Sequence, residues 1–237
     1  MGTESKPSGL KENTTGRVYH VLLKKLVSRE YPPGRKISQG KLAEELKVSR
    51  TPLVKALHKL ETQGLIDNIP GKGFYVHQLT AKELVDLFTL REALDTMIIK
   101  ELVETIQPEQ VAALEDIFSE FVTGDTELSA EAYRKADQEF HNLVLSYSRN
   151  DLVKKLNRHF QIFSRSMIAG LLREPSETLP EHMAIIGALK QKDRDAAISA
   201  TIAHVEKTKK YLDETVDRLQ KLGIDPRRIA MDEIPKE

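Results

Sequence analysis

The stretch LAEELKVSRTPL, residues 42–53, decides the fold of the first part of the chain. Its first five residues carry the apolar face of a helix that begins at about Ser38. The two residues after Leu46 leave room only for a tight turn. Ser49 is then a favourable N-cap, and Pro52 falls in the first turn of the next helix, where its missing N–H costs little. Two helices joined by so short a turn indicate a helix-turn-helix.

The neighbouring sequence completes this unit on both sides. Apolar residues at helical spacing predict a preceding helix over residues 17–29. The helix that starts at Ser49 ends at Gly64. Two short apolar runs, residues 65–66 and 74–76, flank the turn sequence PGKG at residues 70–73 and predict a β-hairpin. Three helices and a hairpin make a winged helix-turn-helix, whose third helix enters the major groove of DNA.

Charge is distributed unevenly along a chain with no net charge. The 237 residues contain 36 Lys and Arg and 36 Asp and Glu. Residues 1–77 hold 14 Lys and Arg against 7 Asp and Glu, and residues 78–237 hold the remaining 22 against 29. A basic first part favours a polyanion as its partner. The alternative is a winged helix that contacts proteins.

Composition excludes several classes of function. The chain has no Cys, which excludes disulfides, thiolate metal sites and a Cys nucleophile. It has no apolar run of about 18 residues, so we expect no membrane span. The polar start, MGTESKPSGLKENTTGR, lacks the apolar core of a secretory signal. We therefore expect a cytoplasmic protein.

The second part of the chain has the pattern of an all-α bundle. Thr80 and Glu83 have the spacing of a capping box, and no strand pattern follows them. The predicted helical stretches are 80–105, 108–123, 126–147, 150–173, 176–190 and 193–221. The fold class is thus mainly α, a winged helix-turn-helix followed by an all-α bundle of six helices. The expected division is a disordered tail at 1–13, a DNA-binding domain at 14–77, a linker at 78–80, a helical domain at 81–222, and a loose tail at 223–237.

The start of the third helix offers side chains suited to DNA. Arg50 can donate two hydrogen bonds to guanine, while Ser49 and Thr51 suit phosphate or base contacts. The wing tip can approach a backbone closely because glycines flank its one cation. The predicted DNA-contact residues are Ser49, Arg50, Thr51, Lys55, Lys59, Lys41, Gly71, Lys72 and Gly73.

Residues 16–77 resemble the DNA-binding domain of GntR-family transcription regulators. The resemblance rests on residues 42–53 and on Pro33-Gly34, Ala56-Leu57, residues 60–66 and residues 71–76. The family has Arg at two further positions, which are Gly40 and Val54 here. Lys41 and Lys55 supply charge nearby, but Lys lacks the planar fork of Arg. The resemblance therefore implies DNA binding more firmly than it implies the family's operator preference.

Four residues of the second part form a candidate metal site. Asp137 and His141 are four positions apart and share a helix face. His182 and His204 lie on two other predicted helices of the same bundle. One carboxylate and three imidazoles suit Zn, Ni, Co, Mn or Fe. The alternative for the Asp137–His141 pair is plain helix stabilisation.

Residues 82–215 resemble the FCD effector domain of the FadR-type GntR regulators. The matching residues are Arg91-Glu92, Asp137, Phe140, His141, Leu143, Asn150, Glu181, His182, Ile185, Ile186, Ala188, Leu189, Asp193, Ala196, Ala197 and His204. In this family the Asp and the three His bind a divalent metal, to which an organic acid coordinates. The resemblance implies the same site here, with Zn or Ni favoured and Mn, Co or Fe open. It also implies that the helical domain at 81–222 binds the effector and forms the dimer. Arg91 is the effector-binding candidate for the acid's second carboxylate, and Asn150, Arg158 and Arg165 are candidates because they lie near the Asp137–His141 helix in the sequence. Each Arg is also explained by a salt bridge and Asn150 by a helix cap.

These features predict a transcription regulator, most simply a repressor, that is not an enzyme. A homodimer would place two winged helices on a two-fold-symmetric DNA operator, and a small carboxylate would be the effector. Two alternatives remain open. The metal itself could be the signal, or the bundle could be a metalloenzyme fused to a DNA-binding module. The chain shows no HExxH, GxGxxG or P-loop motif to favour an enzyme.

Overall fold

The computed structural model describes residues 14–123, 129–160, 165 and 173–225. The chain divides into two compact units, which meet between His77 and Gln78. The predicted tail at 1–13 and most of that at 223–237 lie outside the described residues. Within the described part, no helix has the length and apolar character needed to cross a membrane.

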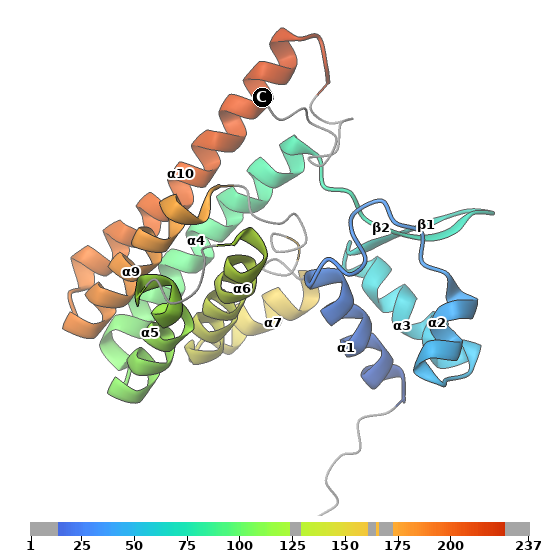
Figure 1. The fold of residues 1–237 in the computed structure, drawn as a ribbon, viewed down its shortest axis with the longest axis horizontal. Coiled ribbons are helices and arrows are strands. Elements are labelled where there is room, and N and C mark those ends of the chain that lie inside the picture. Colours follow the sequence, from blue (N-terminus) through green and yellow to red (C-terminus); the bar gives the residue numbers. More distant parts are fainter. Residues whose placement is uncertain (1–13, 124–128, 161–164, 166–172, 226–237) are drawn as a thin grey trace, which may run out of the picture. The chain divides into compact units, whose positions relative to one another are not determined.

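The first unit has the predicted three helices and hairpin (Figure 1). Its core is built from leucines that the three helices turn toward one another. Leu22 and Leu26 come from the first helix, Leu42 from the second and Leu57 from the third, and all four are at most 2% exposed. The elements are α1 (Thr14–Val27), α2 (Gln39–Leu46), α3 (Arg50–Thr62), β1 (Ile66–Ile69) and β2 (Gly73–Val76).

The turn between α2 and α3 is closed by a residue in the left-handed conformation. Lys47 has φ 51° and ψ 48°, and its N–H reaches the carbonyls of Ala43 and Glu44. Ser49 occupies the N-cap position of α3 as expected, with an extended backbone. Its side chain makes no capping hydrogen bond, however. The hydroxyl is therefore not committed to the helix terminus.

The wing is a two-stranded antiparallel sheet, and a further segment of the chain pairs with its second strand. Ile66 pairs with Val76 and Ile69 with Gly73, which leaves residues 70–72 as the turn. Gly71 and Gly73 have φ values of 72° and 95°, a conformation that favours glycine. Residues 34–37 pair with the other side of β2 through the bridge between Lys36 and Tyr75. The pairing of residues 34–37 with β2 was not predicted from the sequence.

The named elements among the described residues of the second unit are all helices, as predicted. The predicted stretch 150–173 begins with a helix at 151–160, and its remainder, apart from residues 165 and 173, lies outside the described residues. Residues 126–128, predicted as the start of another helix, lie outside them too. The described helices are α4 (Ala81–Thr105), α5 (Pro108–Thr123), α6 (Ala130–Tyr147), α7 (Asp151–Phe160), α9 (Pro175–Gln191) and α10 (Arg194–Lys221).

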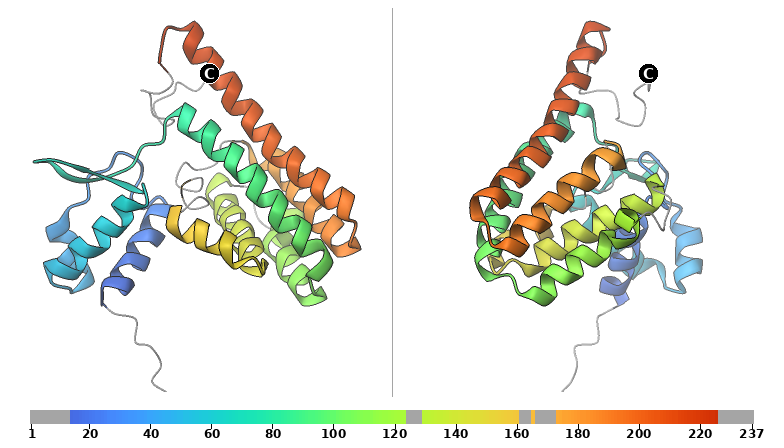
Figure 2. Two further views of the ribbon diagram at one scale, coloured as in Figure 1. Left: turned by 180° about the vertical axis from the view of Figure 1, so that it is seen from behind. Right: turned by 60° about the vertical axis from the view of Figure 1, so that its left-hand side comes forward.

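Two long helices, α4 and α10, run side by side along the bundle (Figure 2). Lys209 of α10 and Glu92 of α4 form an ion pair of 2.6 Å between them. The predicted capping box starts α4: the Thr80 hydroxyl accepts from the Glu83 N–H, and the Glu83 carboxylate accepts from the Thr80 N–H. This reciprocal pair satisfies two of the backbone donors that a helix N-terminus leaves open.

Candidate metal centre and nucleic-acid interface

Three buried histidines converge inside the second unit. His141 projects from α6, His182 from α9 and His204 from α10, and their exposed fractions are 7%, 0% and 8%. One ring nitrogen of each lies within 4.8 Å of those of the other two. This spacing is suited to a single metal ion, so the triad could bind one.

Asp137 lies beside the triad, one helical turn before His141. Its Oδ1 is 3.5 Å from Nε2 of His182 and 3.8 Å from Nε2 of His141. Burial raises the pKa of the Asp137 carboxyl, although His204 and Arg91 act against that shift. The structure thus brings together all four residues that the sequence suggested as ligands.

Aromatic rings form one wall of the cluster. Phe118 of α5 stacks on His182 with ring centroids 5.2 Å apart and an interplanar angle of 10°. Phe140 of α6 lies 4.7 Å from the same ring. Burial in these surroundings lowers the pKa values of His141 and His182 well below the ordinary histidine value, and nearby positive groups add to the effect. The two imidazoles are therefore neutral and have a lone pair to offer a metal.

His182 has one ring nitrogen engaged and one without a hydrogen bond. Its Nδ1 lies 2.9 Å from the Tyr133 hydroxyl, which accepts a hydrogen bond from Thr178 Oγ1. Its Nε2 is buried and makes no hydrogen bond within the part of the chain that the structure describes. Buried polar atoms are almost always satisfied, so this nitrogen indicates an absent partner.

His204 is held by Glu181, a residue that the sequence did not single out for the site. Nδ1 of His204 is 2.9 Å from the Glu181 carboxylate. Burial alone would raise the pKa of Glu181, but hydrogen bonds from His204, Arg173 and Lys207 outweigh it and hold that pKa well below its usual value. The carboxylate is therefore ionised. Its position next to His182 in the sequence was the available signal, whereas its contact with α10 was not readable.

Arg91 of α4 reaches the cluster from the side. The side chain is buried, and Nη2 lies 3.2 Å from Nδ1 of His141 and 3.0 Å from the Asp95 carboxylate. Burial raises the pKa of Asp95, and the paired guanidinium acts against that shift. Arg91 is thus a predicted effector residue that the structure places in direct contact with His141.

The other predicted effector residues have different surroundings. The side-chain oxygen of Asn150 accepts from the N–H groups of Leu152 and Val153, so Asn150 caps α7. Arg158 is exposed in the last turn of α7. Arg165 is half-buried, and its Nε is buried without a hydrogen-bond partner among the described residues. Effector binding by these three residues stays a prediction.

In the first unit, the predicted DNA-contact residues lie at the surface. Ser49, Arg50, Thr51 and Lys55 are exposed at the start of α3. Lys59 is exposed too, and its ammonium lies 3.9 Å from the centroid of the Tyr19 ring. Lys41 on α2 and the turn residues Gly71 and Lys72 are exposed, while Gly73 is half-buried.

The two positions where the family has Arg can be located in this unit. Gly40 is exposed on α2, and a Cβ built there would meet nothing within 4 Å. Val54 is half-buried on α3, one turn after Arg50. Space therefore does not explain the absence of a longer side chain at Gly40.

A winged helix-turn-helix followed by a helical unit with a buried histidine cluster is the arrangement of a two-part DNA-binding protein. Comparison with known families agrees: residues 14–76 match "Bacterial regulatory proteins, gntR family", and residues 86–207 match the FCD domain. The chain belongs to the GntR family of transcription regulators, in its FCD-containing branch.

Relatives of similar sequence are named as regulators as well. The Nta operon transcriptional regulator of Aminobacter aminovorans is 32% identical over 183 residues, covering 76% of this chain and 86% of the relative. The galactonate operon transcriptional repressor of Escherichia coli K12 is 23% identical and covers 85% and 98%. The protein is thus a DNA-binding transcription regulator, in agreement with the expectation that it is not an enzyme.

Solved structures show the same fold. E. coli McbR/YncC superposes with a TM-score of 0.73 at 20% identity, covering 85% of this chain and 98% of that one. A GntR regulator from Rhodococcus sp. RHA1 gives a TM-score of 0.72 at 19% identity, covering 84% and 97%. At these identities the likeness concerns the fold alone.

Proposed function

We propose that this regulator is a homodimeric, cytoplasmic repressor that senses a small organic acid through a divalent metal. Asp137, His141, His182 and His204 would hold the metal in the helical unit. The winged helix would bind a two-fold-symmetric operator. The galactonate relative and RspR of E. coli K12, which is 23% identical, are both transcriptional repressors by name.

The buried Nε2 of His182 carries the metal assignment. It makes no hydrogen bond among the described residues and lies 3.5 Å from an Asp137 oxygen. A ligand nitrogen beside a carboxylate, with its other ring nitrogen engaged, is the usual surrounding of a metal-binding histidine. Three imidazoles and one carboxylate favour Zn or Ni, with Mn, Co and Fe also compatible. When bound, the metal would supply a Lewis-acidic centre with open positions for a ligand.

Charge around the cluster favours an anionic effector. Arg91 and Asp95 form a buried ion pair with an N–O distance of 3.0 Å, so their charges offset each other. Asp137 then contributes one negative charge toward the two positive charges of a divalent ion. The remaining positive charge would be balanced by a carboxylate. Arg91 is placed to bind such a group, because its Nη2 lies 3.2 Å from Nδ1 of His141 in the cluster.

The DNA-reading part of the proposal rests on exposure at the start of α3. Arg50 would donate to guanine O6 and N7, while Ser49 and Thr51 would contact phosphate or base edges. The Ser49 hydroxyl is suited to this because it makes no capping hydrogen bond. Lys72, between two glycines at the wing tip, would contact the backbone of the same half-site.

Exposed apolar side chains on two helices support the dimer. Leu90 and Met97 of α4 are 46% and 47% exposed, and Leu152 of α7 is 65% exposed. The amide nitrogen of Asn150 lies 3.7 Å from the Met97 sulfur, so the start of α7 adjoins this part of α4. A second copy that covered these side chains would remove apolar surface from water.

Effector binding would change operator affinity through the segment that joins the units. An acid bound at the metal would shift a helix of the bundle, and residues 78–80 would transmit the shift to the winged helix. A coupling free energy of about 1–3 kcal/mol corresponds to a change in operator affinity of roughly 5–150-fold.

Native mass spectrometry tests the proposal most directly. The protein would be purified without a chelator and without a nickel column. We expect a dimer with one divalent ion per chain, together with an organic acid whose mass identifies it. A protein that stays metal-free after addition of Zn²⁺ or Ni²⁺ would overturn the metal assignment and leave only the DNA-binding part.

If operator binding responded to the ion alone and to no acid, the metal would be the signal. Titrating the metal-loaded dimer with small carboxylates in an operator-binding assay separates these two outcomes.

A further inference from the structure

The contact between His204 and Glu181 engages one ring nitrogen of His204 and leaves the other one for a metal. Nδ1 of His204 on α10 lies 2.9 Å from Oε2 of Glu181 on α9, and both side chains are 10% exposed. An ionised carboxylate only accepts hydrogen bonds, so Nδ1 must be the protonated nitrogen. Nε2 of a neutral ring in that tautomer holds a lone pair, as a metal ligand must.

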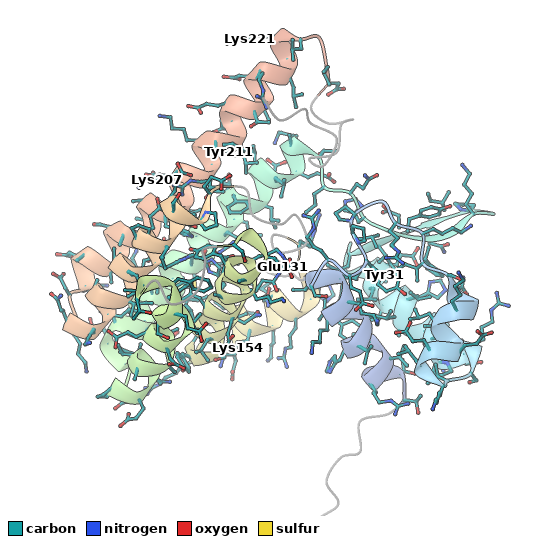
Figure 3. The ribbon with its side chains drawn as sticks, viewed as in Figure 1. Tyr31, Glu131, Lys154, Lys207, Tyr211 and Lys221 are labelled. Carbon is teal, nitrogen blue, oxygen red and sulfur yellow. The ribbon has the colours of Figure 1, made fainter. Side chains whose placement is uncertain are left out.

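Glu181 is itself held in place from two further directions. Arg173 donates from both terminal nitrogens to the two carboxylate oxygens, each over 2.8 Å. Lys207 of α10, labelled in Figure 3, donates to Oε1 over 2.8 Å. Such bidentate, charge-assisted contacts fix the orientation of a carboxylate as well as its charge.

The partner of His182 is different in kind. Nδ1 of His182 faces the Tyr133 hydroxyl over 2.9 Å, and a hydroxyl can donate or accept. Tyr133 therefore leaves both tautomers of His182 possible. The Glu181 carboxylate beside His204 can only accept, so it allows only the tautomer with the proton on Nδ1.

We infer that Glu181 is a positioning residue of the metal centre, which sets the tautomer and ring orientation of His204 while Arg173 and Lys207 hold its carboxylate. This inference rests on the proposed metal site. It goes beyond that site because Glu181 is not one of the four ligands. Carboxylate partners of this kind commonly raise metal affinity about 10–100-fold.

The first test reads the tautomer in metal-free protein. Long-range ¹H–¹⁵N correlation spectra distinguish a protonated Nδ1 from a protonated Nε2. In spectra of wild type with a neutral His204 ring, we expect the proton on Nδ1, which faces Glu181 over 2.9 Å. Glu181→Gln is nearly isosteric, and its amide can donate or accept, so the preference should weaken. A wild-type His204 protonated on Nε2 would overturn the inference, whatever the protein's affinity for metals.

The second test measures Zn²⁺ affinity by competition with a chromophoric chelator. Glu181→Ala and Glu181→Gln should bind Zn²⁺ about 10–100-fold more weakly than wild type. Glu181→Asp should recover part of the loss. Glu177→Gln is the matched control, because Glu177 lies one turn earlier on α9, contacts Arg173 over 3.5 Å and is 55% exposed. Its affinity should equal that of wild type.

The two tests separate the inference from the proposed function. A wild type that binds no Zn²⁺ would overturn the proposed function, while the tautomer spectrum would still judge the role of Glu181. Unchanged Zn²⁺ affinity in folded Glu181→Gln would overturn the inference and leave the metal site standing. Circular dichroism verifies folding, and Glu181→Gln serves if Glu181→Ala does not fold.

Discussion

Histidine occurs in both units of the molecule, but in opposite surroundings. In the winged-helix unit, His58 is 53% exposed and lies 2.7 Å from Glu61, and His77 lies 3.0 Å from Asp67. Each is an ordinary acid–base pair near the surface. In the helical unit, His141, His182 and His204 are buried and face one another. Burial and convergence, rather than residue type, distinguish the candidate ligands.

The same contrast separates the two functional surfaces. The winged helix would act through exposed donors such as Arg50, whose removal leaves the core untouched. The helical unit would act through buried acceptors such as His182, which is also part of the core. Substitutions of the exposed donors in the first unit should therefore change binding alone. Substitutions in the second should change binding and stability together.

The largest effect is expected from His182→Ala. Losing this nitrogen should reduce Zn²⁺ binding below detection in an isothermal titration. The substitution also leaves a cavity against Phe118 and Phe140, and large-to-small changes in a core cost about 2–5 kcal/mol of unfolding free energy. Urea unfolding of the metal-free protein measures that loss.

His58→Ala is the matched control in the other unit, since its ring is largely exposed. It should bind Zn²⁺ and unfold as wild type does. His182→Gln fills more of the cavity, so it should lose Zn²⁺ with a smaller loss of stability. Wild-type Zn²⁺ affinity in either His182 variant would break the contrast between the two units.

Arg50→Ala should have the next largest effect, and on DNA binding alone. The loss of a bidentate contact with guanine corresponds to about 1–3 kcal/mol, or roughly 5–150-fold in operator affinity. The operator would come from selection among random duplexes, and fluorescence anisotropy at physiological salt would give both affinities. The melting temperature should not change because the side chain is exposed. Equal operator affinities of wild type and Arg50→Ala would show that Arg50 does not contact the bases.

Lys72→Ala tests whether the wing tip contacts base edges or only the charged phosphates. A phosphate contact at the wing tip should weaken binding equally on all sequences and reduce the slope of log affinity against log salt by about 1. A sequence-dependent loss would mean that the wing reads bases.

The smallest effects are expected from removing the hydroxyl groups at the starts of α4 and α3. Thr80→Ala removes the hydroxyl that caps α4, which should cost about 1 kcal/mol of unfolding free energy. Ser49→Ala removes a hydroxyl that makes no capping hydrogen bond, so stability should stay within about 0.5 kcal/mol of wild type while operator affinity falls. Thermal unfolding of both variants gives the difference. Equal losses of stability would show that the Ser49 hydroxyl caps α3 in solution.

Local signals explain what the sequence predicted well. The caps, turn residues and apolar spacing around residues 42–53 act within a few positions, so the helices and hairpin of the first unit follow from them. The edge formed by residues 34–37 was missed because it consists of backbone hydrogen bonds to a strand about 40 positions later. Side-chain patterns carry little information on such a contact.

The candidate metal centre was predictable only in part for the same reason. Asp137 and His141 share a helix face, which spacing reveals, but the approach of His182 and His204 depends on helix packing. Their residue type and their place on other helices of the bundle suggested those two, and the resemblance to a family strengthened the assignment. Glu181 meets His204 across two helices and 23 positions, and no pattern along either helix announces that contact.

The helix α4 also has a mechanical consequence. Ten residues separate Ala81, at its start, from Arg91 beside the histidines, which is about 15 Å along the axis at 1.5 Å per residue. The capping box closes the first turn, so the helix does not fray there. A well-formed helix resists both stretching and compression along its axis. A movement of Arg91 along that axis would therefore be carried toward Thr80, three residues after the end of the winged-helix unit.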